Sequence, residues 1–207
     1  GYIQVESDRM EGQDVLLVDA TGLEAEVRGS FLPTRIPDLL TNMVYSVFPA
    51  LADEVNYTHE PQDLRFKITM RDPDELLGVF VPDLRLAPGT TFEGSLDSRR
   101  FDMEFIANIP ELQYGSFRAD STRIIMEKAL DVLAFSLRSD RQSIGDSTWI
   151  AGSAFTGKAY QDELELSVGW ENSASGTSGD LDVQGLVNGV NDLSLDLLPS
   201  KLLLGRG

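Results

Sequence analysis

The side chains that could carry out chemistry are few, and the first to consider is the only histidine, His59. A metal site with several histidines cannot be built from this chain, and a Ser-His-Asp triad would have to use this one residue. His59 lies in a polar stretch, residues 56–61, that is typical of a solvated loop. We therefore interpret it as a loop histidine without a catalytic role.

The other chemistry-bearing groups are carboxylates, since Asp and Glu total 34 and cysteine is absent. Most acidic residues alternate with apolar ones, as on a solvated sheet face, so no catalytic pair across a cleft can be nominated. Without cysteine there is no disulfide, thiolate zinc site or cysteine nucleophile. Phosphate-binding, dinucleotide-binding and nucleophile-elbow motifs are also missing. We predict that the chain is not an enzyme and has no cofactor.

The run Gly179-Asp180-Leu181-Asp182 offers the oxygen ligands that calcium prefers, but its spacing differs from that of a helix–loop–helix calcium site, so we predict no metal.

Charge and composition exclude further classes. The formal charge is −17, which repels nucleic acid and anionic membrane surfaces. No apolar run reaches the roughly 20 residues of a membrane-spanning helix. The chain opens on a strand-like stretch without an initiator methionine, so we interpret residues 1–207 as a single fragment of a longer protein.

Alternation of polar and apolar residues dominates the sequence and predicts strands. It is clearest in residues 163–170, 64–70 and 101–105. Other expected strands are residues 22–31, 90–96, 132–138, 147–156 and 179–186, and residues 120–131 fit a strand better than a helix. With turns expected at Pro88-Gly89, Asp97-Ser98, Ser139-Asp140 and Gly157-Lys158 and along residues 172–191, the pattern predicts a mainly β, antiparallel fold.

Two segments have helical spacing instead. An amphipathic helix is expected within residues 33–52, because the apolar residues have helical spacing and Pro37 falls in the first turn. These apolar residues are Ile36, Leu39, Leu40, Met43, Val44 and Val47. A short second helix is expected at residues 73–81, and mostly continuous β repeats at residues 84–198.

The bulky apolar residues of the expected strands form one aligned set that would lie on the same sheet face. They are Leu64, Phe66, Ile68, Phe101, Met103, Phe105, Leu133, Phe135, Leu137, Leu164, Leu166, Val168 and Trp170. Such a set fits the closed core of a sandwich, and it equally fits a curled sheet whose apolar face lines an open trough for acyl chains. The pattern leaves both alternatives open.

One stretch resembles a known family. Residues 76–95, which contain Pro82-Asp83-Leu84, Ala87-Pro88-Gly89-Thr90 and Gly94, resemble the C-terminal region of TamB proteins, especially those of Bacteroidota. The expected strands 22–31 and 64–70, the helix at 36–48 and residues 109–115 are similar to what surrounds this phrase in the family.

The resemblance implies a fold and a function. The fold is an elongated, curved antiparallel sheet that forms a taco-like hydrophobic groove, with one or two short helices inserted. The full-length protein would be anchored in the inner membrane, cross the periplasm of a Gram-negative envelope, and work with an outer-membrane barrel of the TamA type. Its groove would conduct or shield phospholipid acyl chains and support outer-membrane biogenesis. The alternatives are a β-sandwich module that binds glycans or proteins, and an enzyme of the jelly-roll or β-helix type.

Overall fold

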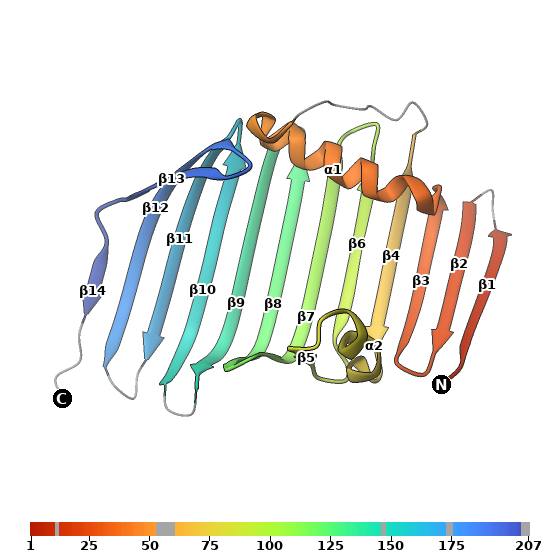
Figure 1. Cartoon of the computed structure of the whole chain (residues 1–207), viewed down its shortest axis with the longest axis horizontal. Coiled ribbons are helices and arrows are strands. Elements are labelled where there is room, and N and C mark those ends of the chain that lie inside the picture. The colour runs from red at the N-terminus through yellow and green to blue at the C-terminus, as the bar shows by residue number, and fades with distance from the viewer. Residues whose placement is uncertain (11–12, 53–60, 146–147, 173–175, 204–207) are drawn as a thin grey trace.

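The chain folds into one open, curved, antiparallel sheet that carries two helices on one face (Figure 1). The computed structural model describes residues 1–10, 13–52, 61–145, 148–172 and 176–203. Within these residues a single sheet is present instead of two sheets packed face to face. The fold class expected from the sequence, a mainly β protein with inserted helices, is therefore confirmed, and the sandwich alternative is wrong.

The elements follow one another with short connections. The first strands are β1 (Ile3–Met10), β2 (Gln13–Ala20), β3 (Leu23–Ser30), β4 (Asp63–Met70), β5 (Leu84–Leu86), β6 (Thr91–Asp97) and β7 (Asp102–Tyr114). The remaining strands are β8 (Phe117–Ala129), β9 (Val132–Ile144), β10 (Thr148–Tyr160), β11 (Glu163–Asn172), β12 (Thr177–Gly189), β13 (Asp192–Leu197) and β14 (Lys201–Leu203). The helices are α1 (Ile36–Val47) and α2 (Pro73–Phe80), and α1 lies between the 3-10 turns η1 (Pro33–Arg35) and η2 (Pro49–Leu51).

The sheet is a meander interrupted twice. Its spatial order is β1-β2-β3-β4-β6-β7-β8-β9-β10-β11-β12-β13, with β5 paired to β7 and β14 paired to β12. The segment containing α1 is inserted between β3 and β4, and α2 with β5 is inserted between β4 and β6. Both insertions match the helical segments expected from the sequence. Each strand otherwise pairs with its neighbour in the chain, so the order of side chains along the sheet follows the order of the sequence.

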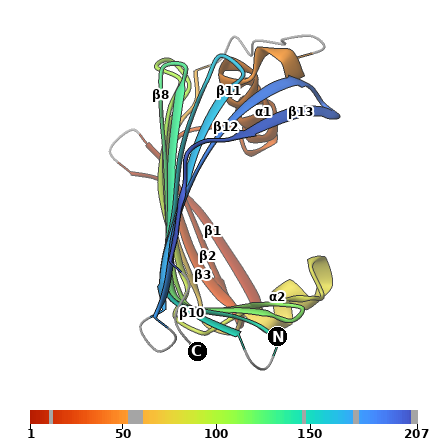
Figure 2. The same cartoon turned by 90° about the vertical axis from the view of Figure 1, so that its left-hand side faces the viewer.

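The sheet bends so that its face with the helices is concave, as the side view shows (Figure 2). Helix α1 lies along the upper part of this face, and α2 lies at the lower end. The axis of the resulting trough therefore runs across the strands, from β1 towards β13. The opposite, convex face carries no helix.

A line of irregular pairing crosses four strands where the sheet bends. Backbone pairing is interrupted at Pro110 of β7, Ser121 of β8, Asp140 of β9 and Gly152 of β10. Ser121 and Gly152 have φ of 51° and 62°, a left-handed conformation that is unusual within a strand. Such irregularities increase local bending. We call this line the crease; beyond it the lower ends of the strands turn towards the concave side (Figure 2).

Three turn predictions were wrong, because glycine and serine have other uses in this sheet. Ser139-Asp140 lies within β9, Gly157-Lys158 lies within β10, and most of residues 172–191 forms the thirteen-residue strand β12. At Gly157 a Cβ atom would lie 2.3 Å from Cζ of Phe135 on the neighbouring strand. The aromatic ring fills the space that a side chain would occupy, which keeps glycine in the strand.

Candidate functional site: the concave apolar face

The strand registers place apolar side chains opposite one another across the concave face. Leu64 of β4 pairs with Leu96 of β6, and Leu96 pairs with Met103 of β7. Further along, Leu166 of β11 pairs with Val183 of β12. Because side chains two residues apart share a face, these pairs extend into continuous apolar rows that run along the trough.

Twelve of the thirteen apolar residues expected to share one face do so in this register. Those on β4, β7, β9 and β11 occupy alternate positions of their strands. Phe101 lies outside the strands, in the turn between β6 and β7, where it packs against the buried cluster beneath α1. The placement of these twelve residues follows from period-two alternation and an uninterrupted register.

The intervening strands contribute residues to this face that the sequence reasoning did not name. They are Leu16, Val18, Ala25, Val27, Phe92, Leu96, Ala107, Ile109, Ile124, Met126, Phe155, Ala159, Leu181, Val183, Leu195 and Leu197. Polar and apolar residues alternate in each of these strands too. The alternation is harder to recognise in their sequences, because glycine or alanine takes some inward positions, as at Gly94 between Phe92 and Leu96.

Glycine and aromatic residues interlock on this face at three places. A Cβ atom added to Gly94, Gly157 or Gly179 would lie within 2.9 Å of the ring of Phe66, Phe135 or Trp170, respectively. Each ring belongs to the strand next to its glycine. Large aromatic side chains therefore lie flat over the backbone of the concave face and give it a broad apolar surface.

Helix α1 lies across the upper part of this face, from β3 to about β9 (Figure 1). Leu39 and Met43 of the helix form a buried cluster with Leu64 and Leu96, and each of the four is at most 6% exposed. The partly buried residues Val27, Phe31, Ile36, Phe66, Phe101 and Met103 pack against this cluster. The inner side of α1 therefore rests directly on the floor of the trough.

The lower part of the same strands is covered by α2 and β5. Leu86, Ala107 and Ile109 form a second buried cluster, and Leu77 of α2 packs against it. Phe105 links the two clusters, since its ring centroid lies 6.4 Å from that of Phe66 and 6.2 Å from that of Phe92. The helices thus cover the upper and lower ends of the concave face of β4 to β8, whereas Phe66, Phe105 and Met126 between them are partly exposed.

The concave face of β9 to β12 is covered at its upper end, where the turn containing Asp162 binds Val47 and Ala50 and where η2 contacts β12. Neither buried cluster contains a residue of these strands. Leu133, Phe135, Leu166, Val168 and Val183 are all partly exposed. At the adjoining edge, Leu195 and Leu197 of β13 are 56% and 68% exposed. Partly exposed apolar side chains therefore line the middle of the trough along its length, since Phe66 and Phe105 on the other half are partly exposed as well.

Helix α1 is fixed to the sheet at both of its ends. On the C-terminal side the Asp162 amide donates to the Val47 carbonyl at 3.1 Å, and the Asp162 carboxylate accepts from the Ala50 amide at 2.9 Å. On the N-terminal side the Gln62 side-chain oxygen accepts from the Leu32 amide at 2.5 Å. These contacts join the helical segment to the start of β4 and to the turn between β10 and β11.

One cation lies on the apolar face. Lys128 of β8 is 3% exposed and pairs in register with Met103 and Leu133. Its Nζ donates to the carbonyls of Phe101 and Leu130, at 2.9 Å for Phe101, and lies 5.6 Å from the centre of the Phe101 ring. Burial lowers the pKa of Lys128 from its ordinary value, although Asp131 and Asp102 oppose this change. The ammonium group of Lys128 therefore donates hydrogen bonds to carbonyls of two turns at the upper ends of the strands.

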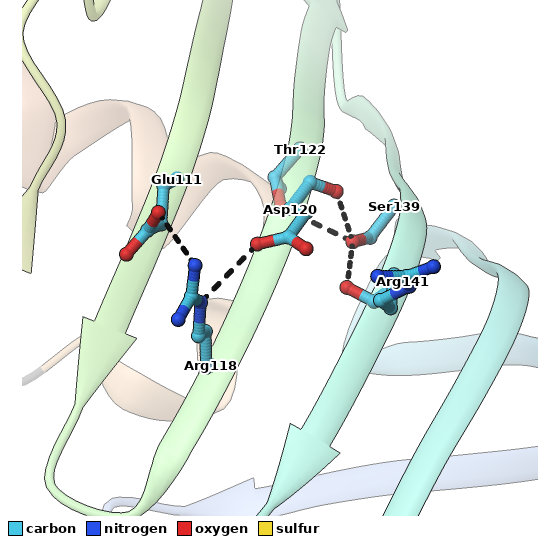
Figure 3. A network of polar contacts seen from close by, with 6 residues as sticks. All are labelled: Glu111, Arg118, Asp120, Thr122, Ser139 and Arg141. Carbon is cyan, nitrogen blue, oxygen red and sulfur yellow. Dashed lines mark hydrogen bonds and ion pairs between the residues drawn. The ribbon is translucent and has the colours of Figure 1, made fainter.

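The crease carries a polar network of its own (Figure 3). The Ser139 hydroxyl lies 2.8 Å from the Asp120 carbonyl and 3.0 Å from the Arg141 carbonyl, two acceptors that the interrupted ladder leaves available. Arg118 bridges two carboxylates, with Nη2 2.8 Å from Glu111 and Nε 3.4 Å from Asp120. These contacts hold β7, β8 and β9 together where regular pairing fails.

The convex face is polar and acidic, with cross-strand ion pairs. Lys67 of β4 lies 2.9 Å from Glu93 of β6, and the hydrogen bond to Glu93 raises the pKa of Lys67. Arg71 binds Asp19 and Glu24, each at 2.7 Å. These pairs are largely exposed and contribute little to stability, so their main effect is to separate a charged outer face from an apolar inner one.

The residues considered from the sequence for metal or acid–base chemistry lie in different parts of the chain. Among the described residues, no three or more His, Asp or Glu side chains gather as a metal ion would require. Asp180 and Asp182, considered for calcium, lie within β12. His59 falls outside the described residues. No helix in the described part of the chain is long and apolar enough to cross a membrane.

Comparisons with protein-family models, with curated proteins and with solved structures find no match for this chain.

Proposed function

We propose that this chain binds the acyl chains of phospholipids along its concave apolar face, as one section of a conduit that carries or shields lipid between two membranes. The observation that carries the proposal is the one-sided sheet. Apolar rows line the concave face, and part of their surface is accessible over β9 to β12.

The chemistry of the trough floor favours hydrocarbon over an extended peptide. The backbone groups of β9 to β12 are paired within the sheet, so the floor offers almost no free donor or acceptor. An extended peptide laid across these strands would bury its own amides without partners, at a cost of about 1–3 kcal/mol for each unpaired group, whereas a helix such as α1 pairs its own amides. An acyl chain has no polar group to satisfy, and its headgroup could stay in water at the rim.

The expected affinity is modest, which suits transport. A buried CH₂ group contributes about 0.8 kcal/mol, so a 16-carbon chain with half of its surface covered would gain about 6 kcal/mol before the costs of association. Along an even apolar surface, neighbouring positions of the chain differ little in energy. A tail can therefore slide without a large barrier, and no residue has to move a proton or hold a metal.

The resemblance to TamB proteins extends this proposal to a cellular setting. In that setting the chain is a periplasmic piece of an envelope protein that is anchored in the inner membrane and works with an outer-membrane barrel of the TamA type. Support comes from the phrase at residues 76–95 and from the curved, one-sided sheet.

Lipid capture by the purified chain tests the proposal. The protein is incubated with phosphatidylcholine vesicles, separated from them by size exclusion, extracted with organic solvent and analysed by mass spectrometry. We expect phospholipid to elute with the folded protein. If extracts of protein that circular dichroism shows to be folded contain no phospholipid, the proposal is wrong.

A further inference from the structure

Two arginines lie directly opposite each other on the convex face, close to the crease. Arg123 of β8 pairs in register with Arg138 of β9, and both are exposed. Each is next in its strand to a residue of the concave face, Ile124 or Leu137, so both arginine side chains lie on the convex side. We infer that Arg123 and Arg138 together bind the phosphate group of a small soluble molecule. The site is on the opposite face from the trough and does not depend on lipid binding.

The two arginines have no counter-charge within the part of the chain that the structure describes. Neither makes an ion pair or a side-chain hydrogen bond there. Asp140, two residues beyond Arg138 on β9, lies at the crease and makes no ion pair with either arginine. Like charges directly opposite each other destabilise a sheet, so an anion that bridges this pair removes a repulsion.

The side chains around the pair are neutral. Asn108 of β7 is in register with Arg123, and Ala154 of β10 is in register with Arg138. The Asn108 amide donates to the Thr91 hydroxyl at 3.4 Å, so it is turned to another partner. The strands on either side therefore supply no carboxylate at this level of the sheet, although the chain has 34 acidic residues against 17 basic ones.

A second arginine pair on the same face shows the usual arrangement in this protein. Arg28 of β3 is in register with Arg65 of β4, and there the Arg28 guanidinium forms an ion pair with Glu26 of its own strand. An acidic side chain thus compensates one of those two cations. At Arg123 and Arg138 that role is left to a bound anion.

Charge and shape favour phosphate among anions. Guanidinium groups present planar sets of N–H donors that bind oxyanions in a bidentate way. A phosphate monoester carries about −1.5 to −2 charges at pH 7 and three acceptor oxygens, which match two arginines. A carboxylate has one charge and two oxygens, so it would leave one arginine uncompensated.

The charge of the whole chain favours a small ligand over a membrane surface. Exposed charges are largely screened beyond a Debye length, about 8 Å at physiological ionic strength. A small ion at the pair therefore interacts mainly with Arg123 and Arg138. An anionic membrane would meet the acidic convex face as a whole, in a chain with a formal charge of −17.

Phosphorus NMR titration of the purified protein with inorganic phosphate at pH 7 and low ionic strength tests the inference. We expect a dissociation constant on the order of 1–10 mM, as suits an exposed site. Arg123→Gln and Arg138→Gln should each weaken binding at least about fivefold, because each removes one of the two charge-assisted contacts. Arg28→Gln removes the same charge from the same face and should leave binding within about twofold. Equal affinities of the three variants, with circular dichroism as the check of folding, would overturn the inference.

Competition identifies the ligand class. Sulfate, which carries two charges, should displace inorganic phosphate, and acetate at the same ionic strength should do so at least about fivefold less well. Displacement by acetate as strong as by sulfate would contradict a phosphate site. Glycerol 3-phosphate should bind like inorganic phosphate. Binding of phosphatidic acid vesicles without binding of either soluble phosphate would overturn the assignment to a small molecule.

Discussion

Gly157 provides a sharp test of how the concave face is built. In the sheet, a Cβ atom at this position would lie 2.3 Å from Cζ and 2.8 Å from Cε2 of Phe135, and 2.9 Å from the Glu165 carbonyl oxygen. Non-bonded carbon atoms prefer separations of about 3.5–4.0 Å. The substitution Gly157→Ala must therefore lift the Phe135 ring off the backbone, because the carbonyl on the other side leaves no room for the methyl group.

The expected loss of stability can be estimated from these contacts. Forcing a methyl group into a packed site typically costs about 1–3 kcal/mol. Lifting the ring also disturbs its contact with Phe155, and an aromatic pair contributes about 0.5–1.5 kcal/mol. Replacing glycine by alanine in a strand returns about 0.5–1 kcal/mol. We expect a net decrease of about 1–3 kcal/mol in the free energy of unfolding, measured by urea denaturation.

Two companion variants make the result interpretable. Gly189 in β12 has no atom within 4 Å of an added Cβ, so Gly189→Ala should be neutral or slightly stabilising. In a Phe135→Leu background the added methyl group meets a smaller side chain, and Gly157→Ala should then cost less than half as much. The reasoning is refuted if Gly157→Ala and Gly189→Ala have the same stability, or if the cost does not depend on Phe135.

Two further predictions concern α1 and the buried lysine. Met43→Ala should lower the free energy of unfolding by about 2–5 kcal/mol, whereas Leu40→Ala, on an exposed part of the same helix, should change it by less than about 1 kcal/mol. Urea denaturation of both variants measures these changes. Similar losses in the two variants would contradict the contact of α1 with the floor. Because burial lowers the pKa of Lys128 in the folded state, the unfolded chain binds more protons above that pKa, so stability should rise as pH increases from it towards 10.5. Thermal unfolding of the wild type and of Lys128→Met across this range measures the effect, and a difference between them that does not change with pH would rule it out.

Much of the fold could be predicted because its physical signals are local. Alternation in residues 163–170 and 64–70 reflects the pleat of a strand that has one solvent-exposed face. Leu39, Met43 and Val47 are spaced by four residues, which is about one helical turn between each of them and the next. The strand order follows from short connections between neighbours. Each signal depends on residues close in the chain, which is why the mainly β fold and the two inserted helices were expected correctly.

The glycine and serine positions show where local signals failed. Gly157 and Ser139 have the chemistry of turn residues, yet both lie inside long strands. Gly157 is retained because the ring of Phe135 on another strand covers it, and Ser139 because its hydroxyl reaches the Asp120 carbonyl across the crease. The partner in each case is about twenty residues away in the sequence, so no local pattern reveals it.

The sequence by itself determined that the protein is mainly β and antiparallel with two inserted helices, since alternation and helical spacing are properties of the chain read residue by residue. The tertiary structure decided that the sheet remains open and bends at Pro110, Ser121, Asp140 and Gly152, and that α1 and α2 cover parts of its concave face. The same alternation satisfies a closed core and an open trough. Only the positions of distant segments determine which apolar side chains meet each other and which remain accessible.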